Sequence, residues 1–266
     1  MTQPEQTELE QCVPPDPRQF GEVAEVYDQL MTGVPYQEWV TYLQRLLKDR
    51  NCRPRHVLDL ACGTGNVTEL LARAGFSVSG VDISEGMIEA ARRKARASGL
   101  DIDFLVQDAA ELDLPGMRFD LCVSLFDSLN YVTDPLRLQL AFHSVSGHLT
   151  RGGLFIFDLN SEYALRNHFF DQNNLGSEDR LRYDWVSDYF AETRLCRVRM
   201  KFWHRQEDGS ERAFEEEHWQ FAYRADEVKE MLTAAGFEEI SVYQAYTMRV
   251  PTKATDRIFY VARRAF

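Results

Sequence analysis

The chain has 266 residues, of which 44% are hydrophobic, and this content excludes a disordered protein and suits one large α/β domain with an inserted subdomain. Thirty basic against 42 acidic residues give a formal net charge of −12, which repels phosphate backbones and anionic membrane faces, so neither nucleic acid nor a membrane is expected as a partner. No apolar run has the length of a membrane span and the polar start lacks a signal-peptide pattern, so we expect a cytoplasmic protein.

The first expected elements are a tail and two helices. Residues 1–16 are rich in Glu, Gln and Pro and are predicted to be disordered. A helix is expected around residues 20–30, and a second follows Pro35, where apolar residues recur at helical spacing. These two helices are placed so that they can form a lid over a ligand site.

From residue 56 onward, strand patterns and helix patterns alternate. Such alternation predicts a mainly parallel, Rossmann-like sheet with helices on both faces. The strands are expected at 56–60, 77–82, 102–106, 119–125 and 153–159, and the helices at 65–73, 84–98 and 135–149.

The pattern changes after Asn160. Period-two alternation over 183–190, 193–204 and 211–223 predicts an antiparallel β insertion, or cap, within residues 161–223. A helix at 225–235 ends before Gly236, and strands at 237–246 and 257–261 are expected to complete the sheet as an antiparallel pair at one edge. Residues 17–160 and 224–266 would then form the α/β domain.

The most specific signal lies where the first expected strand ends, in Asp59-Leu60-Ala61-Cys62-Gly63-Thr64-Gly65. Gly63 and Gly65 lack a Cβ, so the main chain can turn sharply and approach a ligand at the N-terminus of the next helix. Asp82 follows 17 positions after Gly65, close to the roughly 20 expected for an acid that binds a ribose diol. Thr68 stands where a dinucleotide fingerprint has its third glycine, which makes an NAD-dependent oxidoreductase less favoured.

This segment resembles the first motif of the class I S-adenosylmethionine-dependent methyltransferases, with Ala61 where glycine is most usual. The resemblance implies a seven-stranded sheet and S-adenosylmethionine as the cofactor. It also implies that Asp59 and the turn hold the methionine part and that Asp82 holds the ribose. The other residues that it places near the cofactor are Ile83, Met87, Asp108, Ala109, Leu125 and Phe126.

Four further residues are expected at the cofactor. Tyr27 and Trp39, in the two lid helices, present aromatic faces that favour a sulfonium charge. Asn66 opens the helix after the glycine turn, and Asn130 lies in the loop after the fourth strand.

That loop, Ser124 to Tyr131, faces the transferable methyl group in class I methyltransferases. Together with the cap, it looks similar to the enzymes that dimethylate aminosugars. Aligned on Phe126-Asp127-Ser128, this chain has Tyr131 where those enzymes have a histidine. A phenol with a pKa of about 10 is a poor base near neutrality. The implied substrate contacts are Asp127, Asn130 and Tyr131.

Two histidines of the cap, His204 and His218, lie on strand faces from which they could approach a substrate. A structural or solvent-facing role is the simpler interpretation of each, and Glu215-Glu216-Glu217 is interpreted as a solvated strand face. Methyl transfer depends mainly on alignment of the reactants, so no strong catalytic triad is expected. The candidate catalytic residues are Asp127, Tyr131 and His218.

The sequence therefore predicts a methyltransferase that acts on a small polar metabolite, with an amine as the favoured acceptor. An enzyme that transfers another group from the same cofactor and a non-catalytic cofactor-binding protein remain alternatives. A homodimer is compatible with the sequence. No metal site or disulfide framework is expected, because the five cysteines lack C-x-x-C spacing: Cys12, Cys52, Cys62, Cys122 and Cys196.

Overall fold

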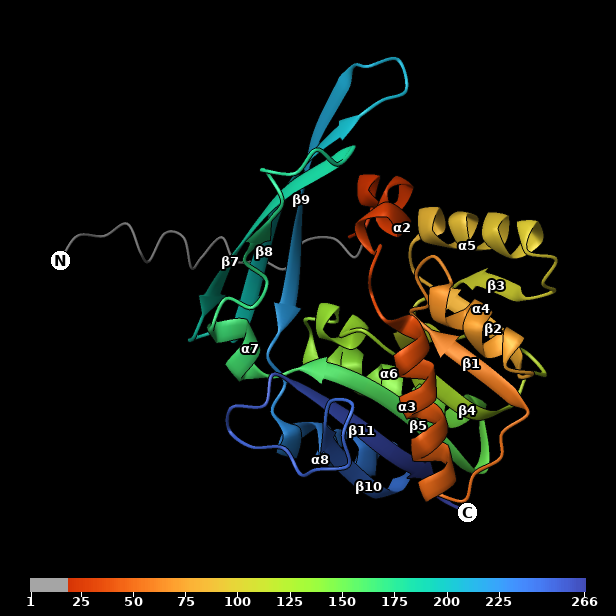
Figure 1. The fold of residues 1–266 in the computed structure, drawn as a ribbon. Helices are drawn as coiled ribbons and strands as arrows, with labels where there is room; N and C mark the ends of the chain where they lie inside the picture. The colour runs from red at the N-terminus through yellow and green to blue at the C-terminus, as the bar shows by residue number, and fades with distance from the viewer. Residues whose placement is uncertain (1–18) are drawn as a thin grey trace.

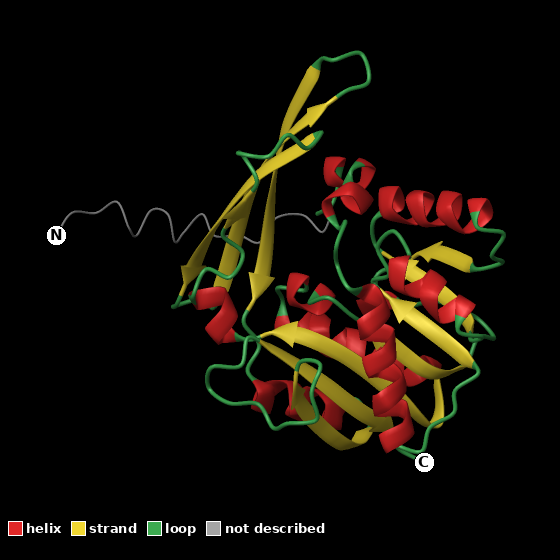
Figure 2. Ribbon diagram, viewed as in Figure 1, coloured by secondary structure: helices red, strands yellow, loops and turns green. Residues whose placement is uncertain are grey.

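The computed structural model describes residues 19–266, so the tail predicted over residues 1–16 lies outside the described residues. Two sheets organise the chain (Figures 1 and 2). The larger sheet has helices on both faces, and the smaller one stands away from it beside the N-terminal helices. This arrangement confirms the predicted fold class.

The larger sheet has seven strands in the order β10-β11-β5-β4-β1-β2-β3. Strands β1 to β5 run parallel to one another, and β11 runs antiparallel to both β5 and β10. The bounds are β1 His56–Leu60, β2 Ser77–Asp82, β3 Asp103–Val106, β4 Phe119–Ser124, β5 Leu149–Asn160, β10 Phe237–Gln244 and β11 Arg257–Arg264.

Both faces of this sheet are buried, as is usual for parallel strands. Successive residues of β1 show the alternation: Val57 packs in the cluster with α3 (Tyr36–Asp49) and α4 (Asn66–Arg73), whereas Leu58 packs in the cluster with α6 (Pro135–His148) and α8 (Ala225–Ala234). Helix α5 (Glu85–Ala97) packs on Phe104 of β3. Among residues 19–266, no helix combines the length and apolar character needed to cross a bilayer.

The predicted first helix is broken in two, the 3-10 turn η1 (Glu22–Glu25) and the short helix α2 (Tyr27–Leu30). The break lies at Val26, whose φ of −114° and ψ of 2° are not helical. The amide of Val23, in the first turn of η1, donates to Glu216 Oε1 at 2.8 Å. We call residues 20–30 the lid segment.

The smaller sheet lies within the residues predicted as the cap, and its strand order is β6-β7-β8-β9. One face packs against the lid segment through Val198, Met200 and Phe202. The turn at Gly209, with φ +85°, closes the hairpin between β8 and β9. Two short elements were not predicted, α7 and β6. The bounds are α7 Glu162–Arg166, β6 Gln172–Asn173, β7 Leu181–Phe190, β8 Leu195–Arg205 and β9 Glu211–Phe221.

Candidate active site

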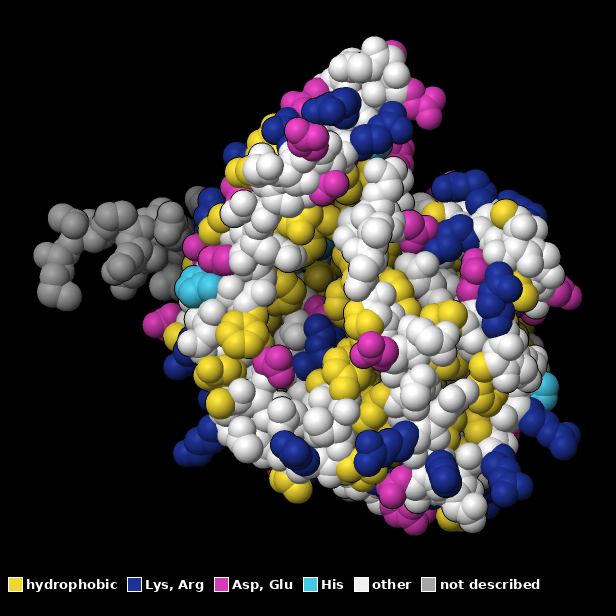
Figure 3. Space-filling model, viewed as in Figure 1, with side chains coloured by type: hydrophobic (Ala, Val, Ile, Leu, Met, Phe, Trp, Pro, Cys, Tyr) yellow, Lys and Arg dark blue, Asp and Glu magenta, His cyan; other side chains and the backbone are white. Residues whose placement is uncertain are grey.

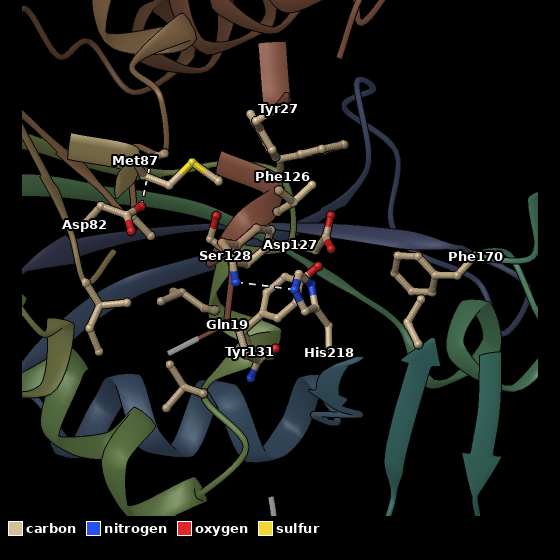
Figure 4. Close-up of a pocket in the computed structure, with 18 of the residues that line it drawn as sticks. Gln19, Tyr27, Asp82, Met87, Phe126, Asp127, Ser128, Tyr131, Phe170 and His218 are labelled. Atoms are coloured by element: carbon tan, nitrogen blue, oxygen red, sulfur yellow. Dashed lines mark hydrogen bonds between the residues drawn. The ribbon is translucent and has the colours of Figure 1, made fainter. Parts of the chain in front are cut away.

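A cavity of about 620 Å³ lies between the carboxyl ends of the parallel strands, the lid segment and the cap. This is the place where open α/β sheets bind ligands, and the volume is within the usual range of cofactor and small-molecule sites. Figure 3 shows the hollow between the smaller sheet and the main body, with hydrophobic side chains at its walls. In Figure 4, Asp82 and Met87 lie at one end, Phe170 at the other, and Tyr131 and His218 between them.

The glycine turn forms part of the cavity wall, and its backbone is not covered by large side chains there. Ala61 and Gly63 both line it, and both have a positive φ, +56° and +55°. Apart from its chain neighbours, no heavy atom lies within 4 Å of the position that a Cβ on Gly63 would take. A ligand can therefore contact the backbone of Gly63 directly. The positive φ also explains why glycine is usual at the position of Ala61.

Gly65 has a different role from the one predicted. It does not line the cavity but caps α4 with φ +80°, and a Cβ there would lie 3.0 Å from Phe104 Cζ. Its missing side chain lets the start of α4 lie close to Phe104 of β3 and Ala91 of α5.

Asp82 stands at the end of β2 and lines the cavity as predicted. Its Oδ2 accepts from the Gly63 amide at 2.8 Å, and its Oδ1 accepts from the Ser84 amide at 2.9 Å. Burial raises the pKa of Asp82, against the lowering effect of these amides. Each oxygen keeps a second lone pair, so the carboxylate remains able to accept from a ribose diol.

The expected adenine end is also assembled. Ile83, Met87, Asp108 and Ala109 all line the cavity. Asp108 Oδ2 accepts from Arg137 at 2.6 Å, and its Oδ1 accepts from the amide of Ala110 at 2.8 Å. Arg137 was not predicted, because it comes from α6, which follows in the chain after β4.

Asp59 and Asn66 lie near the turn but do not line the cavity. Asp59 is buried and accepts from Thr68 Oγ1 at 2.6 Å, and burial raises its pKa to about 7. Asn66 Nδ2 donates to Asp28 Oδ1 at 3.0 Å, and its own Oδ1 accepts from Lys94 at 2.5 Å. Asp59 thus supports the glycine turn from inside the protein, and Asn66 links the turn to the lid segment.

Three other predicted cofactor residues belong to the core. Trp39 is 5% exposed and packs against Phe126, with ring centroids 5.0 Å apart, and Leu125 lies in the same cluster. Asn130 is buried and donates to the carbonyls of Asn160 and Phe221, at 3.2 and 3.0 Å. These side chains are already committed to packing or to backbone hydrogen bonds, whereas Tyr27 and Phe126 do line the cavity.

Asp127 lines the cavity and has one protein donor on each oxygen. Its Oδ1 accepts from Arg257 and its Oδ2 from Gln220, both at 2.7 Å. Arg257 also binds the buried Asp158, whose two oxygens accept the amides of Phe126 and Asp127. Burial raises the pKa of Asp127, and its donors Arg257 and Gln220 fix the carboxylate in place at the cavity floor. Arg257, Asp158 and Gln220 had no recognisable motif in the sequence.

Tyr131 and His218 meet at the centre of the cavity, with ring centroids 5.8 Å apart. Phe20 of the lid segment packs on both rings, at 5.1 and 4.3 Å. Burial raises the pKa of Tyr131, so its phenol is a donor rather than a base.

His218 is buried, its Nε2 lies 2.7 Å from Glu216 Oε2, and the Phe20 amide donates to the same Nε2 at 3.3 Å. The two contacts require opposite tautomers of the ring, because a carboxylate only accepts and an amide N–H only donates. The shorter contact, to a charged acceptor, favours a proton on Nε2, and this tautomer leaves a lone pair on Nδ1. The interpretation of Glu215-Glu216-Glu217 as a solvated strand face was therefore wrong for Glu216, whose side chain is 10% exposed, whereas Glu215 and Glu217 are exposed. The interpretation fails because strand alternation places Glu216 on the same face as His218, toward the lid. His204 lies farther along the hairpin and does not line the cavity.

Comparison with known proteins places these features in a wider group. Residues 57–153 match a family model described as a methyltransferase domain. A Geobacillus sp. (strain WCH70) protein with a provisional methyltransferase name is 32% identical over 90% of this chain and 96% of its own length. A solved S-adenosylmethionine-dependent methyltransferase from Clostridium acetobutylicum is 31% identical, with a TM-score of 0.81, over 92% of this chain and 98% of that one. An amino pentose methyltransferase from Micromonospora echinaspora, solved with S-adenosylmethionine bound, shares the fold at 22% identity and a TM-score of 0.70, over 90% and 97% of the two chains.

Proposed function

This chain belongs to the S-adenosylmethionine-dependent methyltransferases, and we propose that its acceptor is an amine nitrogen on a small molecule bound in the cavity. The observation that carries the proposal is the pairing of His218 with Glu216 beside the central part of the cavity.

The residues present fit the cofactor. The open space at Gly63 and the remaining lone pairs of Asp82 suit the amino acid part and the ribose, and Ile83, Met87 and Asp108 suit the adenine. When bound, S-adenosylmethionine supplies an electrophilic methyl group on a sulfonium with a good leaving group. The protein's task is therefore to orient the acceptor and to remove a proton from it.

The charges around the cavity favour a cationic acceptor. Its lining includes Asp82, Asp108, Asp127 and Asp134, against Arg137 and Arg257. Excess negative charge in a partly desolvated cavity attracts an ammonium group. Aromatic rings along the same walls add a favourable surface for a cation.

An ammonium ion has no lone pair, so it must lose a proton before it attacks. His218 has the required arrangement: Glu216 holds the Nε2 proton, which orients the ring and leaves Nδ1 as the acceptor. Asp127 is paired with the guanidinium of Arg257, and Tyr131 is a protonated phenol. His218 is therefore the proposed general base.

The test uses purified protein, S-adenosylmethionine and a panel of small primary and secondary amines, with mass spectrometry of the products. We expect an N-methylated product and S-adenosylhomocysteine in equal amounts. His218→Asn should lower kcat by about 10²- to 10⁴-fold, the usual contribution of a general base, with unchanged cofactor affinity. The matched control, His204→Asn, should retain full activity.

Methylation confined to oxygen or carbon acceptors would overturn the amine proposal. An active His218→Asn variant with normal kcat would remove His218 as the base while leaving the acceptor class intact.

A further inference from the structure

The end of the cavity beneath the cap is walled by apolar and aromatic side chains. Residues Tyr183 and Trp185 of β7 and Val198 and Met200 of β8 share one strand face, because Trp185 is paired in register with Met200 and Tyr183 lies two residues away. Phe169 and Phe170, just before β6, close the same end. Figure 4 shows Phe170 across the cavity from Asp82 and Met87.

The wall contains one unsatisfied polar atom. Trp185 Nε1 is buried and has no hydrogen-bond partner among residues 19–266. A buried donor without a partner costs free energy, and in native proteins such a group calls for an explanation. The ring of Trp185 lines the cavity, but the enclosed Nε1 is not open to it, so a bound molecule with an oxygen or nitrogen acceptor would meet this donor only after the ring turned.

The cavity offers little to a phosphate. Within the described part of the chain its two lining cations are both paired, Arg137 with Asp108 and Arg257 with Asp127 and Asp158. A phosphorylated acceptor would have to displace one of these carboxylates, and it would also face the excess negative charge of the lining.

We propose that the cap end of the cavity binds the body of the acceptor and that this body is flat, largely apolar and free of phosphate. The inference rests on the proposed function and names its substrate class: an amine on an aromatic or similarly planar framework, placed with its nitrogen toward His218. The apolar face drives binding by desolvation, and the aromatic rings select a planar shape.

The experiment measures binding by calorimetry to the protein saturated with S-adenosylhomocysteine, so that no transfer is required. The probes are 5-methoxytryptamine, which has a planar apolar body with an ether oxygen, glucosamine, and glucosamine 6-phosphate. We expect 5-methoxytryptamine to bind at least ten times more tightly than either sugar. Equal or tighter binding of a sugar, or no binding of 5-methoxytryptamine, would overturn the inference.

Two variants locate the site. Trp185→Ala should weaken 5-methoxytryptamine binding at least tenfold, whereas Trp203→Ala, on the opposite face of the cap sheet, should leave it unchanged. Unchanged S-adenosylhomocysteine binding by both variants shows that they are folded. Equal effects of the two substitutions on the probe would overturn the placement at this wall.

This binding assay and the methylation assay described above together separate the two proposals. Tight binding of 5-methoxytryptamine without methylation of any amine would support the apolar site and overturn the proposed function. Methylation of glucosamine, together with tighter binding of glucosamine than of 5-methoxytryptamine, would support the proposed function and overturn the apolar site.

Discussion

At the scale of single residues, burial determines what each acid near the glycine turn does. Asp82 keeps an open side toward the cavity, whereas Asp59 is fully enclosed with Thr68 as its donor. The two carboxylates also disfavour each other's ionisation, and burial raises the pKa of Asp59 to about 7. Two acids beside one turn thus have different surroundings: Asp82 is open to the cavity, and Asp59 is enclosed beneath the turn.

This difference predicts a pH dependence of stability. An acid whose pKa is raised on folding binds a proton more tightly in the folded state. Stability therefore falls as pH rises from the unfolded pKa, about 4, to the folded value of about 7. Asp59→Asn removes this titration and keeps an acceptor for Thr68. The free energy of unfolding of the variant, measured relative to that of the native chain, should therefore rise by roughly 3–4 kcal/mol between pH 4 and pH 8. This value uses about 1.4 kcal/mol for each unit of difference between the folded and unfolded pKa.

Urea unfolding at the two pH values measures the gain, and Asp103→Asn, at an exposed position on β3, is the control. An equal difference between Asp59→Asn and the native chain at both pH values would contradict the prediction.

At the scale of elements, the lid segment is held at both ends by polar contacts rather than by its own helix. Asp28 Oδ1 accepts from Thr64 at 2.7 Å and from Lys94 at 3.0 Å, which ties α2 to the glycine turn and α5. At the other end, Glu216 accepts the Val23 amide, and Arg212 binds Glu22 and Glu25. The segment joins the cap to the cofactor side of the cavity.

The Asp28 contacts predict how the lid responds to mutation and to pH. Burial acts to raise the pKa of Asp28, but the hydrogen bonds from Thr64 and Lys94 outweigh it and lower the value. The stabilisation is therefore present above the unfolded pKa, about 4, and is lost as pH falls below it. Asp28→Asn should speed amide exchange across residues 22–30 and increase the rate of S-adenosylmethionine release several-fold at pH 7.

Hydrogen exchange with mass spectrometry and stopped-flow dissociation measure these two effects. Asp49→Asn, an exposed acid on α3, provides the control. Unchanged exchange in the Asp28 variant would show that the lid does not depend on this carboxylate.

At the scale of the whole molecule, buried polar groups join the cap to the sheet domain. Gln220 of β9 contacts both Asp127 and Asn160, and Asn130 binds the carbonyl of Phe221. Arg257 of β11 lies beneath them and neutralises Asp127 and Asp158. The cavity floor is thus also the junction between the two sheets.

Removal of Arg257 should therefore affect the whole fold. Arg257→Leu leaves two buried carboxylates without a counter-charge, which costs about 3–5 kcal/mol for a broken buried pair. Thermal and urea unfolding should show this loss, and Asp158→Asn added to the variant should recover part of it. Arg249→Leu, at an exposed position, is the control. A loss below 1 kcal/mol would mean that water already reaches this network.

The sequence by itself determined the fold class and the strand and helix order, and it pointed to the glycine turn and Asp82, which border the cavity. Those features arise from local geometry and from periodic burial, which short stretches of sequence encode. It did not predict that Trp39, Asn66, Leu125 and Asn130 would be committed elsewhere, or that Arg137, Glu216, Gln220 and Arg257 would join the site. Only the tertiary structure decided those contacts, because they bring together α6, β9 and β11 with loops far away in the chain. The role of a polar side chain depends on which of its donor and acceptor atoms remain without a partner after these distant segments have packed together.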